Sequence, residues 1–155
     1  MNDARLQLEE EGAVTLGYNT DLYALLRAID EAMPRDAVLA IEGTHIAAEV
    51  RQFLLEREPA QKPELVANTI WPTSEVFHLP LSGSNLEELR DLAENFAEPE
   101  VGDHLMVYRG GDVLLWAHDA SDGFVRLAAT VPREAVEALR SALGPTLRKS
   151  KWRRG

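Results

Sequence analysis

A pair of apolar runs joined by Gly110-Gly111 constrains the fold of this chain more than any other feature. Glycine pairs suit tight hairpin turns, so residues 104–109 and 112–118 predict two antiparallel strands. Because an apolar sheet face must be covered, and both faces of this hairpin are largely apolar, we expect both to pack against something. Counted through a two-residue turn, one face carries His104, Met106, Tyr108, Val113, Leu115 and Ala117, and the other carries Leu105, Val107, Leu114 and Trp116.

Helical and strand-like segments alternate along the rest of the chain. Apolar residues recur at helical spacing in four segments, 22–33, 46–54, 86–96 and 136–143. Short apolar runs of strand length lie at 37–41, 65–70, 75–81 and 124–129. Strands separated by helices favour right-handed parallel crossovers. We therefore predict an α/β fold, with α+β as the alternative: a mixed sheet of about five to six strands, with parallel βαβ crossovers followed by an antiparallel meander and helices on one or both faces.

Polar residues follow several of the predicted strands. If the strands at 37–41, 75–81 and 104–109 are parallel, their carboxyl ends meet at one edge of the sheet, where open sheets usually bind ligands. The helix N-termini at that edge favour a phosphate or carboxylate. The competing interpretation is that Thr44 and Ser84, the latter with Glu87 in a capping box, only cap their helices. The candidate ligand-binding residues are Glu42, Thr44, His45, Ser82, Ser84, Asn85 and Arg109.

The opposite edge is predicted to hold a second polar group, made of Asp103, His104, His118, Asp119 and Asp122. With a two-residue turn, Asp103 faces His118, while His104 faces Ala117 and lies diagonal to Asp119. The two His–Asp pairs then point to opposite faces of the sheet. Each face offers two ligands, whereas a structural zinc ion takes four. We therefore predict no metal ion and no cofactor.

Catalytic patterns are weak. The chain has no cysteine, which excludes a thiol nucleophile and a thiolate metal site. It also lacks a G-x-S-x-G elbow and an H-E-x-x-H motif. His45 and Glu49, four residues apart, form either a base with its carboxylate or an ordinary surface pair. His78, between Phe77 and Leu79, is typical of a hydrogen-bonded histidine in a sheet. We assign no catalytic residue, and the balance favours a non-catalytic protein.

Charge is distributed unevenly along the 155 residues. The net charge is −10, from 26 acidic and 16 basic residues. Five bases lie in the last eight positions, so residues 1–147 carry 26 acids, 11 bases and a net charge of −15. Such a body repels nucleic acid, which only the basic tail is suited to contact, and attracts basic proteins. We expect one domain over residues 1–147 and a basic C-terminal tail over 148–155.

These features predict a small acidic cytoplasmic protein that binds another protein, with a regulatory, inhibitory or immunity-like role. No apolar run approaches the length of a membrane span, and residues 1–11 do not resemble a signal peptide. The alternative function is a small-ligand-binding protein or enzyme that uses the loops at 42–45 and 82–85. A third alternative is a homo-oligomer that buries the second sheet face against its own copy.

Overall fold

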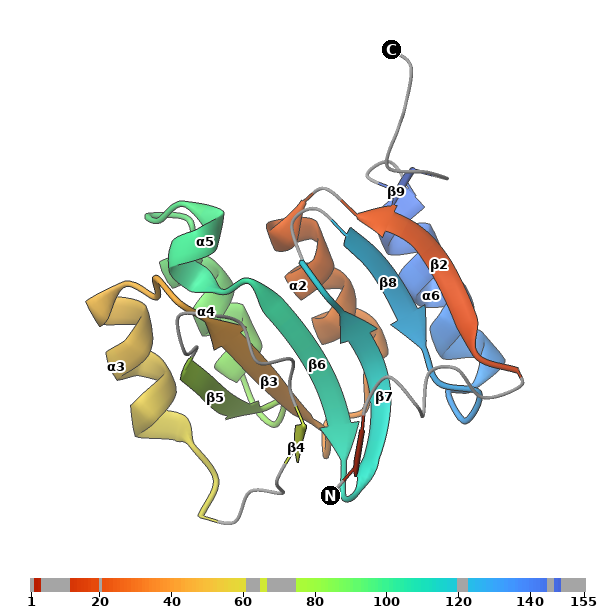
Figure 1. Cartoon of the computed structure of the whole chain (residues 1–155), viewed down its shortest axis with the longest axis horizontal. Coiled ribbons are helices and arrows are strands. Elements are labelled where there is room, and N and C mark those ends of the chain that lie inside the picture. Colours follow the sequence, from red (N-terminus) through yellow and green to blue (C-terminus); the bar gives the residue numbers. More distant parts are fainter. Residues whose placement is uncertain are drawn as a thin grey trace.

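The computed structural model describes residues 2–3, 12–19, 21–60, 65–66, 75–119, 123–144 and 147–148. Its main feature is a seven-stranded sheet with the strand order β5-β3-β6-β7-β8-β2-β9 (Figure 1). Every pairing in this sheet is antiparallel. The strands are β2 (Val14–Asn19), β3 (Val38–Gly43), β5 (Glu75–Pro80), β6 (His104–Arg109), β7 (Asp112–Ala117), β8 (Gly123–Leu127) and β9 (Leu147–Arg148). Two further short strands, β1 (Asn2–Asp3) and β4 (Leu65–Val66), pair with each other in parallel.

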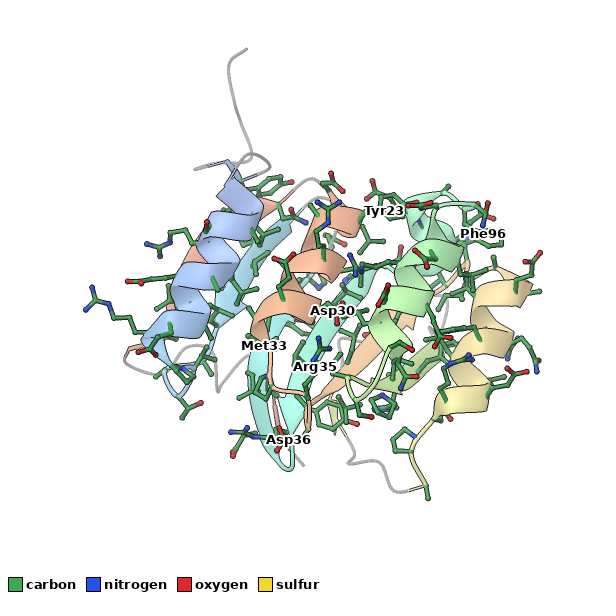
Figure 2. All side chains as sticks on the ribbon, turned by 180° about the vertical axis from the view of Figure 1, so that it is seen from behind. Tyr23, Asp30, Met33, Arg35, Asp36 and Phe96 are labelled. Carbon is green, nitrogen blue, oxygen red and sulfur yellow. The ribbon has the colours of Figure 1, made fainter. Side chains whose placement is uncertain are left out.

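Helices cover one face of the sheet (Figure 2). Four of them lie side by side in the order α6, α2, α4, α3, with contacts between each adjacent pair. The short α5 lies between α4 and β6 in the chain. The helices are α2 (Leu22–Ala32), α3 (Ala48–Arg57), α4 (Asn85–Ala93), α5 (Glu98–Val101) and α6 (Arg133–Leu143). None of the described helices is long and apolar enough to cross a membrane.

The core lies between the sheet and the helix layer. Alternate residues of β3 and β6, such as Leu39, Ile41 and Leu105, are fully buried. They belong to the same buried cluster as the apolar stripe of α2, which includes Leu25 and Ile29. Each fully buried leucine or isoleucine contributes roughly 1.5–3 kcal/mol through the area it removes from water. The strongly apolar face of α2 therefore holds the centre of the helix layer to the sheet.

The central strands are also buried on the face opposite the helices. Met106, Tyr108 and Trp116 lie on that face, and each is less than one tenth exposed. His78 of β5, on the other side of β3, is buried there as well, and its Nδ1 lies 2.7 Å from the hydroxyl oxygen of Tyr108. This confirms His78 as a hydrogen-bonded histidine within the sheet. The apolar character of both hairpin faces is thus matched by burial on both faces.

The predicted parallel crossovers are wrong. β3 pairs with β5 and β6, and both pairings are antiparallel. Since β5 and β6 both oppose β3, they run in the same direction, but β3 separates them and no parallel pair forms. The connection from β3 through α3 begins and ends at one end of the sheet, because Gly43 is the register partner of Glu75. The antiparallel meander β6-β7-β8 is confirmed, and the fold class is α+β.

The antiparallel pairing redistributes the polar residues between the two ends of the sheet. Glu42, at the end of β3, is paired with His104, at the start of β6; we call this the His104 end. The other end, which we call the hairpin end, contains the β6–β7 turn and the end of β5, where Pro80 is paired with Val38. The prediction that the loops at 42–45 and 82–85 share one edge is therefore wrong.

Several predictions fall on residues outside the described ranges. They concern most of the strand predicted at 65–70, Asp122, and the basic tail beyond residue 148. The assignment of residues 1–147 to one domain and 148–155 to a tail stays a prediction.

Candidate functional site at the His104 end of the sheet

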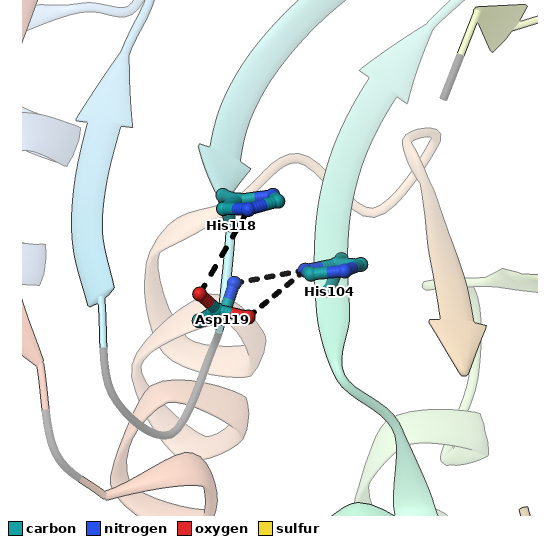
Figure 3. Close-up of side chains that lie close together, drawn as sticks. All are labelled: His104, His118 and Asp119. Carbon is teal, nitrogen blue, oxygen red and sulfur yellow. Dashed lines mark hydrogen bonds and ion pairs between the residues drawn. The ribbon is translucent and has the colours of Figure 1, made fainter. Parts of the chain in front are cut away.

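A β-bulge in the hairpin brings two histidines together. The pairing of β6 with β7 begins at Arg109 and Asp112, and it shifts by one residue so that Val107 is paired with Leu115. Leu114 is the extra residue of this bulge. From there to the His104 end every side chain of β7 is on the face opposite to the one predicted. His104 and His118 consequently lie on the same face, with their rings stacked at a centroid distance of 4.2 Å (Figure 3).

The His104 ring is buried and has a defined hydrogen-bond role. It is 2% exposed, and its Nδ1 accepts a hydrogen bond from the backbone N–H of Asp119 at 2.8 Å. A nitrogen that accepts carries no proton, so the neutral ring has its hydrogen on Nε2. That Nε2 atom is buried, and it has no hydrogen-bond partner among the described residues. Burial, and next the positive charge of His118, lowers the pKa of His104 below its ordinary value of 6.5.

Asp119 reaches both rings (Figure 3). Its Oδ1 lies 3.7 Å from Nδ1 of His104, and its Oδ2 lies 3.8 Å from Nε2 of His118. The residue has a φ of 53°, in the left-handed region that aspartate adopts more readily than most residues. This backbone conformation belongs to the turn that directs the Asp119 amide toward His104. One carboxylate is therefore available to whichever ring carries a proton.

The trio of His104, His118 and Asp119 has the composition of a metal site but not its geometry. Their ligand atoms lie within 4.8 Å of one another. A metal ion lies close to the plane of each imidazole that binds it, because the nitrogen lone pair points in that plane. The two ring planes differ by 4° and are stacked, so no single ion lies in both. Nδ1 of His104 is also already occupied by the Asp119 amide.

A second polar network lies at the same end of the sheet. The carboxylate of Asp103 accepts a hydrogen bond from the Thr44 amide at 3.2 Å and a longer one, 3.5 Å, from the Thr44 hydroxyl. Oγ1 of Thr44 lies 2.8 Å from Nδ1 of His45. His45 is exposed and precedes α3, so it does not share a helix face with Glu49. Glu42 is buried beside His104, whose protonated form its charge favours.

The remaining predicted ligand residues lie at the hairpin end. Ser82 and Ser84 are exposed, and Ser84 occupies the N-cap position of α4 without a side-chain hydrogen bond to the helix. The predicted capping box with Glu87 is therefore absent. Asn85 instead donates from Nδ2 to the carbonyl of Pro80, at 3.0 Å. Arg109 forms an ion pair with Asp36 at 3.3 Å.

A cavity of about 250 Å³ also lies at the hairpin end, between α2, α6 and the hairpin. Met33, Leu114 and Val131 contribute to its apolar walls, and Arg109 and Asp112 contribute the charged groups. These two charges are opposite and adjacent in the hairpin register. The cavity therefore shows no preference for an anion over a cation.

The seven predicted ligand residues thus divide into two groups. Glu42, Thr44 and His45 join the polar group at the His104 end, while the other four lie at the hairpin end. Sequence reasoning missed the stacking of His118 on His104. Its signal was the unequal length of the two runs, since 112–118 has one residue more than 104–109 and an extra residue is what a bulge requires. Whether any of these residues binds a ligand stays a prediction.

Comparison of the chain with protein-family models, with curated proteins and with solved structures gives no match.

Proposed function

We propose that this protein is a small, non-catalytic module that binds a basic surface of another protein through α4, in a regulatory, inhibitory or immunity-like role. The observation that supports it best is a line of exposed carboxylates along the outer face of α4 and the residue after it. Glu87, Asp91 and Glu94 are exposed and spaced four and three residues apart, so they lie on one helix face. The opposite face of α4 is fixed against the core by Leu86 and Leu89.

The acidic face of α4 is poorly neutralised by its own helix. Residues 85–103 contain seven acids and one base, Arg90. That arginine forms an ion pair with Asp30 of α2 at 3.1 Å, so its charge is directed toward the neighbouring helix. Like charges four residues apart destabilise a helix by a few tenths of a kcal/mol, about 0.2–0.5 per pair. A basic partner removes this repulsion, and long-range attraction speeds the encounter.

The excess of acid is local to part of the helix layer. On α6 the charges balance, with Arg133 and Arg140 against Glu134 and Glu137. Arg133 and Glu137 form an i,i+4 ion pair at 3.1 Å. A requirement for aqueous solubility alone favours carboxylates on either helix. The contrast between α4 and α6 therefore supports a directed interaction.

An exposed leucine lies on the helix next to α4. Leu55 of α3 is 48% exposed, and α3 packs against α4. The other large exposed apolar residues of the described chain, Val76 and Phe124, belong to strands. Protein interfaces combine an apolar anchor with a polar, charged rim. Arg57 of α3 pairs with Glu88 of α4, so Leu55, two residues earlier, lies on another face of α3, and the carboxylates of α4 support the proposal without this apolar anchor.

Charge reversal on α4 tests the proposal. The variant carries Glu87→Lys, Asp91→Lys and Glu94→Lys, and the matched control carries Glu31→Lys, Glu134→Lys and Glu137→Lys. Both change the net charge equally and alter exposed residues only. Each protein is immobilised and exposed to host extract at about 50 mM and about 300 mM salt, where screening differs several-fold. The captured proteins are identified by mass spectrometry.

The proposal predicts that the wild type and the control capture basic proteins at low salt. High salt should release these proteins, and the α4 variant should not capture them. A purified candidate should then bind the wild type at least about tenfold more tightly than it binds the α4 variant, which corresponds to about 1.4 kcal/mol. Equal losses of binding in the α4 variant and in the control would show that only the net charge of the protein matters, and would contradict a role for α4. Capture that salt does not weaken would also contradict the proposal.

A further inference from the structure

We propose that the contact between the Asp119 amide and the neutral His104 ring is an acid-sensitive latch, which holds the end of β7 closed and is released when His104 takes up a proton. We call this contact the His104 latch. It is independent of the proposed interaction through α4. It rests on the geometry of three side chains, those of His104, His118 and Asp119, and on the backbone amide of Asp119 (Figure 3).

The latch depends on the neutral form of the ring. The Asp119 amide donates to Nδ1 of His104, which accepts only while it carries no hydrogen. Protonation gives both ring nitrogens a hydrogen. The Asp119 nitrogen and Nδ1 of His104, which are 2.8 Å apart, then each carry a hydrogen directed at the other, and the hydrogen bond is lost.

The carboxylate of Asp119 offers the protonated ring a different partner. Its Oδ1 lies 3.7 Å from Nδ1 of His104, too far for a hydrogen bond but close enough to replace the amide after a small movement. That movement changes the backbone of Asp119, which has the left-handed φ of 53°. Release of the latch therefore exchanges an amide–imidazole bond for a carboxylate–imidazolium pair and moves the end of β7.

Charged groups from each neighbouring element act on His104. Glu42 of β3, Asp103 just before β6, and Asp119 at the end of β7 favour the protonated ring, and His118 opposes it. His118 is stacked on His104 and its side chain is 43% exposed, so water can solvate a charge on His118 far better than one on His104. Two imidazolium rings at 4.2 Å repel each other strongly, and protonation of either ring therefore opposes protonation of the other.

The direction of the pH dependence follows from burial. The pKa of His104 is lowered in the folded protein, first by desolvation and then by His118. The released state, in which the ring reaches water, therefore binds more protons than the closed state as the pH falls below about 6.5. Acid consequently shifts the equilibrium toward release, and the latch is fully closed above that pH.

Nuclear magnetic resonance of the full chain tests the latch directly. Nitrogen spectra of the histidine rings identify the protonated nitrogen of His104, and hydrogen exchange reports the protection of the Asp119 amide. At about pH 8 we expect the Nε2–H tautomer and a protected amide. Between about pH 8 and about pH 5 the protection of Asp119 should fall about tenfold, which is what the loss of one hydrogen bond produces. Its midpoint should coincide with that of the His104 ring, while the amides within β6 and β7 stay protected.

Three variants separate the latch from a general loss of structure. In His104→Asn the side-chain amide oxygen takes the position of Nδ1 and accepts the same hydrogen bond but does not titrate, so the protection of Asp119 should not change with pH. His118→Gln removes the opposing charge and should raise the midpoint, whereas Asp119→Asn removes a favourable charge and should lower it. If His104→Asn does not fold, the opposite shifts of the midpoint in the other two variants test the proposal. Constant protection of Asp119 down to about pH 5, or the same acid response in folded His104→Asn, would overturn the proposal.

Discussion

At the scale of the residue, Leu114 determines where the polar site lies. Without the bulge at Leu114, the two-residue turn sends His104 and His118 to opposite faces, as the sequence alone predicts. With it, the rings stack and Asp119 reaches both. Periodicity identifies the hairpin and its buried faces, but it does not locate an inserted residue inside an apolar run. The alternation of side chains along a strand therefore does not predict that His104 and His118 lie on one face, although the sequence places both in one polar group.

A second residue-scale contact gives a prediction for stability. Tyr108→Phe removes the hydroxyl next to His78 and leaves a buried polar ring without this hydrogen-bond partner. We expect the free energy of unfolding to fall by about 1–2 kcal/mol, measured by urea denaturation at neutral pH. The control is Tyr23→Phe, which removes a 2.5 Å hydrogen bond to the Phe96 carbonyl at a half-buried site (Figure 2). We expect a smaller loss there, and equal losses would contradict the importance of burial at His78.

The same tyrosine predicts an alkaline effect. Burial, and next the charge of Glu58, raises the pKa of Tyr108 to about 12 from its ordinary value of 10.0. In the unfolded chain this tyrosine loses its proton at lower pH, so the unfolded state binds fewer protons between about pH 10 and about pH 12. The contribution of Tyr108 to stability is therefore complete below this range and is lost across it. Denaturation at several alkaline pH values should show a flatter decline for Tyr108→Phe, and identical declines would contradict the raised pKa.

At the scale of the element, local sequence predicts where the helices lie, but tertiary contacts decide how their N-termini are capped. Helices α2, α3, α4 and α6 occur close to the predicted segments. In α2, α4 and α6 a clear apolar stripe explains this, whereas α3 buries only Val50 and Leu54. The caps differ. Thr44 bonds to Asp103 and lies before α3, and Ser84 leaves its cap bond unmade. Long-range partners compete for these short polar side chains, and local sequence does not reveal them.

Two glycines provide a prediction about turns. A Cβ on Gly123 would lie 1.9 Å from the carbonyl oxygen of His118, whereas one on Gly110 would meet nothing within 4 Å. Gly110 has a φ of 61°, so Gly110→Ala should cost about 1 kcal/mol from backbone strain alone. Gly123→Ala should cost more, about 3 kcal/mol, because the backbone must shift. Thermal unfolding of both variants measures this order, and the reverse order would contradict the close approach of β8 to the end of β7.

At the scale of the whole molecule, the strand pairing was the main property that sequence did not reveal. A helix between two strands is consistent with a parallel crossover, but it is equally consistent with a return to the same end of the sheet. The segment 58–74 between α3 and β5 is long enough for that return. The positions of β3, β5, β6, β7 and β8 and the meander followed from hydrophobic pattern, while the direction of β5 relative to β3 depended on contacts between distant residues.

The charge of the molecule predicts its response to salt. The net charge of −10 produces self-repulsion, which added salt screens. We expect the melting temperature to rise by about 2–5 °C between about 20 and 300 mM sodium chloride, measured by calorimetry. The α4 charge-reversal variant should gain less, because three of its carboxylates have become cations. A melting temperature that falls with salt would instead indicate that attractive ion pairs dominate.

The most direct test of the account is a nuclear Overhauser spectrum of the full chain with labelled histidine, recorded above the pH at which His104 titrates. The structure predicts strong contacts between the ring protons of His104 and His118, whose centroids are 4.2 Å apart, together with antiparallel backbone contacts between β3 and β5. Ring contacts of His104 with Ala117 in place of His118 would contradict the bulge. That result would also contradict the site at the His104 end and the His104 latch, because both depend on the bulge.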